Sequence, residues 1–374
     1  MKQEGTAIKP GSRVVIVHLG RAKAKGEVRR VESWVQVLEA AGATVELLPE
    51  LPEHRAAKVE ILANAISFDW LGRTVPEALS WSWRSVAERL DVLNPDAIVF
   101  VSVRAFHPRL TRGGIPTVLD FVDQLSVSYR DRARISNNWI HKAGLWSLAR
   151  FARRAERVSR PGVVRISDGV GDAEALDAEW FPIVIDRYGL SSDAAELAAP
   201  SDIPGGVDVL FFGTLSYPPN VEAVKRLAGL WPQIAAARPQ ASAIIAGSSP
   251  TPAIRALVER VDGWELMENF ADMNSLLAQA RVAVVPLRRA SGMQIKVLDA
   301  ACRGVAQVVD PIVLRGFDTA FPVAQAATDE AFVTQVLRLL SDDRARHAEG
   351  AAAQAYVIEN YSPQKWACRL TELV

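Results

Sequence analysis

The stretch from Arg281 to Gly304 contains a lysine beside a loop that is suited to holding an anion. Residues 282–285 form a short apolar run, typical of a parallel strand covered on both faces, and Pro286 ends it because proline cannot donate to a ladder. Past the loop the apolar residues have helical spacing, so the first amides of the helix point into the loop with the positive end of its dipole. Lys296 lies in that first turn, where a cation slightly opposes the helix dipole, and a bound phosphate would explain its presence there. The alternative is an ordinary surface lysine.

Two segments upstream follow the same order of strand, glycine turn and helix. In Val207–Asn220 a β-branched and aromatic strand reaches a turn at Gly213, and a Pro-Pro-Asn sequence opens an amphipathic helix over residues 221–237. Ala241–Pro250 is again a strand followed by Gly247 and a helix start. The carboxyl ends of parallel strands meet at one edge of a sheet, where ligands bind in doubly wound folds. The three units together therefore predict a ligand site at this edge.

Two aspartates, Asp120 and Asp123, follow an apolar run within Thr117–Tyr129. If a helix begins at Asp120, both carboxylates lie on the same side at the edge of the sheet, where a carboxylate can act as a general base. We expect Asp123 to act as a base and Asp120 to support it structurally. The alternative is that Asp120 only caps the helix.

Composition limits the class of protein. The 374 residues are 49% hydrophobic and 23% charged, so the chain can bury a large core, and its length favours two domains of roughly 180 residues. Its formal net charge is zero, which argues against nucleic acid as a partner. Cys302 and Cys368 lie in helical contexts where we expect core residues, and they form no metal-type spacing with the histidines. The apolar runs are too short to span a bilayer and the N-terminal residues lack a signal-peptide core, so we expect a cytoplasmic protein, soluble or peripheral to the inner face of the membrane.

The N-terminal half also alternates strands and helices. A helix is expected over Glu27–Ala41 with a stop at Gly42, and strands over 12–20, Thr44–Leu48, Ala97–Ser102, Pro116–Leu119 and Val163–Ser167. Irregular sequence from Arg187 to Gly206 indicates a linker. We therefore predict an α/β protein with two Rossmann-like domains facing a cleft, each a parallel sheet flanked by helices. The predicted parts are a first domain over 1–190, a linker over 191–206, a second domain over 207–360 and a final helix over 361–374.

The segments FFGTLSYPPN, IIAGSSP and ARVAVVPLRRASGMQIKVLDAACRG, in this order, resemble the nucleotide-sugar-binding domain of GT-B glycosyltransferases, especially the retaining enzymes of glycosyltransferase family 4. The resemblance covers most of residues 205–320. It implies that the first glycine turn contacts the donor diphosphate, the middle loops hold the nucleoside, and the last strand, loop and helix contact the sugar and diphosphate. The donor-binding residues it implies are Gly213, Thr214 and Leu215 near the phosphates, Gly247 and Ser248 near the nucleoside, Asn269 and Phe270 near the base, Ser291, Gly292, Met293, Gln294 and Lys296 around the sugar diphosphate, and Asp299 at the ribose.

The chain departs from this family at two places. The first glutamate of the family's Glu-x7-Glu motif would fall at Ser291, and the Arg/Lys pair that follows the first glycine turn is absent from Thr214–Asn220. In the family those cations neutralise the donor diphosphate. Here we expect Lys296 to supply the charge, helped by Arg288 or Arg289 and by helix amides, while one of the two arginines is a solvated loop residue.

On the acceptor side, the resemblance implies that Asp123 orients the acceptor or takes the proton of its hydroxyl. It also implies that Gly20, at the end of the first strand, approaches the acceptor, with Gly26 and Arg29 close behind it. A plain turn from strand to helix is the alternative. The resemblance also implies that the final helix packs back on the first domain. Further candidates for an acceptor groove are Trp70, Trp81 and Trp83, whose alternative role is inward packing.

We therefore expect a retaining, hexosyltransferase-like enzyme that moves a sugar from a nucleotide diphosphate sugar, a UDP-sugar by default, to a carbohydrate, lipid-linked or small-molecule acceptor. The resemblance implies no cofactor and no metal. Two other classes stay open. A nucleotide-sugar epimerase would need more acidic and histidine residues, and a non-catalytic nucleotide-sugar-binding or scaffold protein is favoured by Ser291 and by the absent Arg/Lys pair.

Basic charge is concentrated in residues 104–160 despite the zero total. Within residues 136–160, Trp139, Trp146 and Phe151 interleave with arginines and a lysine. Such a face can rest on an anionic membrane or hold a polyprenyl-diphosphate acceptor. We favour the alternative, an amphipathic helix with its aromatic residues in the core and its arginines in water.

Overall fold

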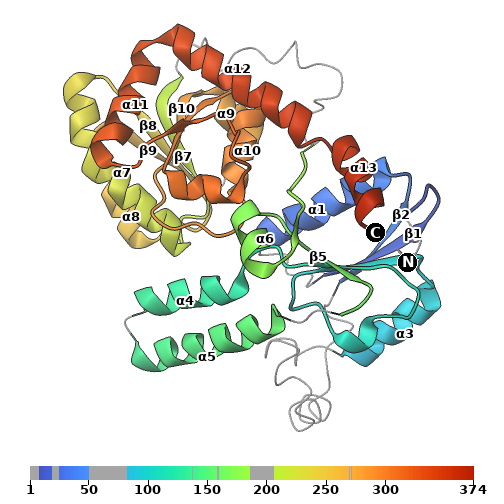
Figure 1. Ribbon diagram of the computed structural model, residues 1–374. Helices are drawn as coiled ribbons and strands as arrows, with labels where there is room; N and C mark the ends of the chain where they lie inside the picture. The colour runs from blue at the N-terminus through green and yellow to red at the C-terminus, as the bar shows by residue number, and fades with distance from the viewer. Residues whose placement is uncertain are drawn as a thin grey trace. The chain divides into compact units, whose positions relative to one another are not determined.

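The protein, described here by a computed structural model, folds into two compact units (Figure 1). The first unit comprises residues 1–185, 291–293 and 362–374, and the second comprises residues 186–290 and 294–361. The structure describes residues 8–18, 25–49, 82–136, 138–157, 160–185, 206–268, 270 and 272–374. Gly20, Trp70, Trp81, Asn269 and all but the last residue of the predicted linker lie outside these ranges.

The first unit is built on a parallel sheet of six strands, which are β1 (Arg13–His18), β2 (Thr44–Pro49), β3 (Ala97–Val101), β4 (Thr117–Asp120), β5 (Val163–Ser167) and β6 (Glu179–Trp180). They lie in the order β2-β1-β3-β4-β5-β6. Every residue of β3 is buried, as expected for a central strand covered on both faces. Phe100 belongs to the apolar core on one face and Val99 to the core on the other. The sheet therefore has helices on both sides.

The helices of the first unit are α1 (Lys25–Ala40), α3 (Trp83–Leu93), the short 3-10 helix η2 (Pro108–Leu110), α4 (Leu125–Ile135), α5 (Trp139–Ala155), α6 (Val170–Leu176) and α13 (Pro363–Leu373). The C-terminal helix α13 packs against α1, and its Trp366 ring meets Trp180 and Phe181 edge-on at centroid distances of 5.2 and 5.1 Å. The pair α4 and α5 covers the other core, which contains Tyr129 and Leu145. Residues from the two ends of the chain thus complete one unit.

The second unit is also a parallel sheet of six strands. These are β7 (Val207–Phe212), β8 (Ala243–Gly247), β9 (Trp264–Glu268), β10 (Ala280–Val285), β11 (Ala306–Val309) and β12 (Ala324–Gln325), in the order β12-β11-β10-β7-β8-β9. Its helices are α7 (Pro218–Ala237), α8 (Pro252–Val258), α9 (Met273–Ala278), α10 (Ile295–Cys302), η4 (Pro311–Gly316), α11 (Asp329–Ser341) and α12 (Asp343–Asn360). The two central strands, β7 and β10, are paired and almost wholly buried. Their carboxyl ends lie side by side, so the loops that follow them share one edge of the sheet.

The predicted elements are present, and the differences lie at their ends. Helix α7 begins at Pro218, before the expected start at residue 221, because proline fits the first turn of a helix, where no N–H partner is needed. No helix begins at Asp120, which was the condition for Asp120 and Asp123 to lie on the same side. Asp120 is the last residue of β4, and α4 begins only at Leu125 with Gln124 as its N-cap. Between them the chain turns at Val122, whose φ of 65° is unusual for a β-branched residue.

Two burial predictions also need correction. Cys302 is buried, but Cys368 is exposed, because α13 turns Trp366, Ala367 and Leu370 toward the core. The favoured prediction that the aromatic residues of segment 136–160 lie in the core is wrong for Trp139 and Trp146, which are exposed. No helix within the described ranges is both long and apolar enough to cross a bilayer.

Candidate active site

The glycine turns of the second unit lie close together at the carboxyl edge of its sheet. The Gly213 N–H donates to the Ala246 carbonyl at 3.0 Å, and the Leu215 N–H donates to the Ser248 carbonyl at 2.8 Å. A Cβ atom at residue 247 would lie only 1.7 Å from the Gly213 carbonyl oxygen. Glycine is therefore required at Gly247 for the two loops to approach each other this closely.

Lys296 lies over the first of these turns. Its Nζ donates to Asn220 Oδ1 at 2.8 Å and lies 4.8 Å from the centre of the Phe211 ring. A Cβ atom at Gly213 would be 3.1 Å from Nζ, so the ammonium group rests against the bare glycine backbone. Burial lowers the pKa of Lys296 to about 7. A partly desolvated ammonium group with a neutral partner can accept an anion at this turn.

Asn220 holds this arrangement together, although the sequence analysis did not select it. Its Nδ2 donates to the Thr214 carbonyl at 3.0 Å while its Oδ1 accepts from Lys296. The side chain is buried in the first turn of α7, within the Pro-Pro-Asn sequence that opens the helix. A polar residue at a helix start beside a glycine turn is the feature that points to it.

The two arginines after β10 are paired with carboxylates of the second unit. Arg288 bonds Asp329 at 2.6 Å and Asp310 at 3.3 Å, and Arg226 contacts the same two carboxylates. Arg289 forms an ion pair with Glu222. A role for Arg288 in donor binding stays a prediction, and it would require the arginine to be shared with or released from these partners.

The remaining predicted donor residues differ in exposure. Leu215 is fully buried and Asp299 is 2% exposed, so Leu215 can reach a ligand only through its backbone. Gln294 is half-buried at the N-cap of α10, and Phe270 packs against the apolar core of its unit. Their contacts with a nucleotide sugar stay predictions.

The first unit contains a group of carboxylates at the carboxyl edge of its own sheet. Asp120 is fully buried, and its Oδ2 accepts from Arg30 Nε at 2.5 Å and from Trp34 Nε1 at 2.7 Å. Its Oδ1 accepts from the Val122 N–H at 2.9 Å. Both oxygens are thus engaged, and Asp120 fastens the end of β4 to α1 instead of capping a helix.

Within this group, the pKa values of Asp123 and Asp168 are raised most clearly. Burial raises the pKa of Asp123 to about 6; Asp172 and Glu156 also raise it, and Arg104 lowers it. Burial likewise raises the pKa of Asp168 well above its usual value; Arg30 opposes the shift, while Asp120, Asp123 and Asp172 add to it. Carboxyl groups whose pKa is raised from its usual value are suited to general acid and base chemistry.

Residues 291–293 belong to the same unit by their contacts. The Gly292 N–H donates to Asp172 Oδ2 at 2.7 Å, and the Met293 N–H donates to Asp168 Oδ1 at 3.3 Å. Both amides were predicted to bind the donor diphosphate. In this structure both amides donate to carboxylates, which present anionic oxygens as a diphosphate does.

Asp168 and Asp172 were missed by the sequence analysis. The strand over Val163–Ser167 was predicted, and Asp168 comes directly after it, so a rule that selects residues at strand ends would have found it. Arg29, predicted on the acceptor side, is half-buried on α1. Trp83 is partly buried and stacks on His107 with the ring centroids 5.1 Å apart. Within the described ranges, no group of three or more His, Cys, Asp or Glu side chains is placed to hold a metal ion.

Comparisons with known proteins agree with this architecture. Residues 206–342 match the family model described as glycosyl transferases group 1. A comparison with curated protein sequences found no match.

Solved structures similar over nearly the whole chain include HepE and two glycosyltransferases. HepE of Anabaena, crystallised with UDP and glucose, is 12% identical with a TM-score of 0.58, and the match covers 96% of this chain and 98% of HepE. WaaG, a glycosyltransferase involved in lipopolysaccharide biosynthesis, is 13% identical with a TM-score of 0.60, over 96% and 99% of the two chains. AviGT4, involved in avilamycin A biosynthesis, is 16% identical with a TM-score of 0.61, over 97% and 96%. The chain therefore has the two Rossmann-like domains of the GT-B glycosyltransferase fold, and its residues 206–342 match the group 1 glycosyl transferases.

Proposed function

We propose that this protein is a glycosyltransferase that moves a sugar from a nucleotide diphosphate sugar to an acceptor hydroxyl. The position of Lys296 supports this most directly, because its ammonium group lies against the Gly213 turn and is held there by Asn220. The match of residues 206–342 to the group 1 glycosyl transferases supports the same assignment. So does the fold shared with HepE, whose structure was determined with UDP and glucose.

On the donor side, Lys296 would stabilise the leaving group. When the bond between the anomeric carbon and the diphosphate oxygen breaks, negative charge develops on the diphosphate. An ammonium group placed there binds the transition state more strongly than the ground state, and so raises the rate. A bound diphosphate also favours the charged form of lysine, which offsets the effect of burial on its pKa.

On the acceptor side, Asp123 would receive the proton of the attacking hydroxyl. Because burial raises its pKa to about 6, it is ionised at neutral pH and is still basic enough to take a proton. The acceptor oxygen then bonds to the anomeric carbon as the diphosphate leaves. A second route, in which the leaving phosphate itself takes the proton, makes Asp123 an orienting residue.

Several finer features are proposed from the family resemblance. They are retention of the anomeric configuration, transfer of a hexose, UDP as the nucleotide, reaction without a metal or cofactor, and a carbohydrate, lipid-linked or small-molecule acceptor. The HepE complexes with UDP and UDP-glucose agree with the choice of nucleotide.

A thermal-shift panel with UDP, GDP, dTDP and their sugars tests the proposal. A ligand at a hundred times its Kd adds about 2.7 kcal/mol to the free energy of unfolding, so a bound nucleotide should raise the Tm by several degrees. Slow hydrolysis of the stabilising donor, followed by nuclear magnetic resonance, would then support a transferase. No response to any nucleotide would favour a scaffold, and an epimerised sugar among the products would favour an epimerase.

A further inference from the structure

Helix α5 begins with a turn and a half that contacts little of the protein. All six residues 139–144 are exposed, and they include Trp139 at 77% and Ile140 at 64% exposure. Trp146, one turn further along, is 40% exposed. Large apolar side chains grouped at an exposed helix end indicate a binding surface.

The exposed apolar residues continue into a basic stripe on the same face of α5. Trp139, Trp146 and Arg153 are spaced by seven residues, which is close to two helical turns, so they lie on one side of the helix. Arg150 and Arg157 flank this line and are also exposed. The opposite side of α5 supplies Leu145, Ala149, Ala152 and Ala155 to the core of the first unit. These four residues pack α5 against the core, and the residues of the stripe take no part in that packing.

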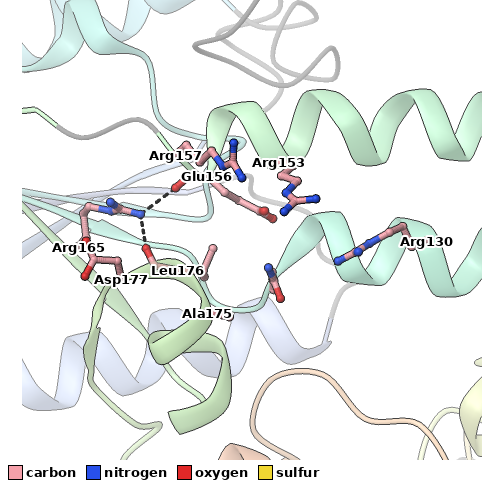
Figure 2. Close-up of a pocket in the computed structure, with 9 residues that line it drawn as sticks. Arg130, Arg153, Glu156, Arg157, Arg165, Ala175, Leu176 and Asp177 are labelled. Atoms are coloured by element: carbon pink, nitrogen blue, oxygen red, sulfur yellow. Dashed lines mark hydrogen bonds between the residues drawn. The ribbon is translucent and has the colours of Figure 1, made fainter.

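Positive charge is concentrated around this stripe. Residues 125–157, which contain α4 and α5, have eight arginine and lysine residues and two acidic residues, in a chain whose net charge is zero. A pocket of about 430 Å³ opens beside the C-terminal end of α5. Four arginines line it, together with Glu156 and Asp177 (Figure 2). These arginines are Arg130, Arg153, Arg157 and Arg165.

The guanidinium groups of the pocket come from separate segments. Arg165 is fixed by hydrogen bonds to the Glu156 and Leu176 carbonyls (Figure 2). The Arg130 Nε donates to the Ser126 carbonyl at 3.2 Å. Arg153 and Arg157, at the end of the stripe, are exposed. Arginine forks of this kind match the oxygens of a phosphate group.

We propose that this face of α5 docks on an anionic lipid bilayer. Trp139, Ile140 and Trp146 enter the boundary between headgroups and acyl chains, while Arg150, Arg153 and Arg157 contact lipid phosphates, one of which the arginine pocket can hold. Tryptophans beside a basic helical face are typical of interfacial helices, and each cation near an anionic surface strengthens binding by about fivefold. The excess of positive charge disfavours a second copy of the chain as the occupant, because like faces repel.

Vesicle co-sedimentation of the full chain tests this proposal without any donor or acceptor. The protein should bind vesicles of phosphatidylglycerol and phosphatidylcholine, bind pure phosphatidylcholine vesicles at least tenfold more weakly, and dissociate from the anionic vesicles at high salt. The double variant Trp139→Ser/Trp146→Ser and the double variant Arg150→Gln/Arg153→Gln should each lose at least tenfold in affinity. The matched controls are Val92→Ser and Arg89→Gln, which change exposed residues of α3, elsewhere in the first unit.

Three results would overturn the proposal. In the first, the protein binds both kinds of vesicle equally or binds neither. In the second, the control variants weaken binding as much as the α5 variants do. A wild type that sediments as a dimer, with a monomeric tryptophan variant and unchanged vesicle binding, would identify the face as a contact between copies. An unchanged Tm in the variants would show that they fold. Since no nucleotide is present, failure here leaves the proposed sugar transfer untouched.

Discussion

At the scale of single residues, Asp120 and Asp123 show how neighbouring carboxylates take different roles. Asp120 is fully buried and binds Arg30, Trp34 and the chain itself. Asp123 lies beyond the left-handed turn at Val122, and its pKa is raised chiefly by burial and further by neighbouring acidic groups. A strained turn of this kind is common where a side chain is aimed at a ligand. The first aspartate therefore serves the fold and the second is available for chemistry.

Removing the charge of Asp120 should destabilise the protein strongly. Arg30 would be left buried without its carboxylate, so Asp120→Asn should lower the free energy of unfolding by about 3–5 kcal/mol. The matched control is Asp91→Asn, which removes a more exposed pair with Arg112 and should cost under about 1 kcal/mol. Urea denaturation measures both. A cost below about 1 kcal/mol for Asp120→Asn would contradict the structural role of this pair.

The pH dependence of transfer should report Asp123. If its carboxylate is the base, kcat/KM should rise about tenfold per pH unit on the acid side of its pKa of about 6 and level off above it. Asp123→Asn should lose this limb and about a hundredfold or more in rate. If Asp123→Asn keeps both the rate and the acidic limb of the pH profile, Asp123 is not the base. The proton of the acceptor would then go to the leaving phosphate.

Asp168 should make the fold less stable as the pH rises. Its pKa is higher in the folded chain than in the unfolded chain, so the folded chain binds more protons and the free energy of unfolding falls as the pH increases above about 3.8. Asn cannot ionise and its Oδ1 can still accept from the Met293 N–H. The Tm of Asp168→Asn minus the Tm of the wild type should therefore increase as the pH rises from acidic to neutral. A difference that stays constant with pH would contradict the raised pKa.

At the scale of elements, the close approach of two loops sets the geometry of the proposed donor site. A methyl group at residue 247 would collide with the backbone of Gly213, which cannot move away without separating β7 from β8. Gly247→Ala should therefore cost at least about 2 kcal/mol in unfolding free energy and weaken nucleotide binding. Gly229→Ala, within α7 and with open space around the position, should instead stabilise by about 0.5–1 kcal/mol. Equal effects from the two changes would contradict this account of the loops.

The elements themselves were largely predictable from the sequence, and their ends were not. Apolar runs such as Ala97–Val101 and Val207–Phe212 are unambiguous as buried parallel strands. The start of α4 was misplaced because an aspartate after a strand looks like a helix cap, whereas Asp120 has its partner Arg30 ninety residues away in the chain. The exposure of Trp139 and Trp146 was also missed, because tryptophans at helical spacing usually lie in a core.

At the scale of the whole molecule, the strand and helix order predicted two Rossmann-like domains, and the structure contains two parallel six-stranded sheets. The candidate site was only partly predictable. The glycine turns and Lys296 follow a local pattern, but Asn220 as the partner of Lys296 and the raised pKa of Asp168 arise from contacts between distant segments. Return of α13 to the first unit likewise depends on packing between Trp366 and Phe181, which no local pattern contains.

Binding of UDP to the whole protein, measured by calorimetry against pH, tests the donor site most directly. Because the pKa of Lys296 is about 7, the affinity of the wild type should fall as the pH rises above that value, whereas Lys296→Arg should keep its affinity. Lys296→Met should bind at least tenfold more weakly at neutral pH, and the control Lys225→Met, an exposed lysine on α7, should bind normally. Equal affinity for UDP in Lys296→Met and the wild type would contradict the proposed role of the ammonium group over the Gly213 turn.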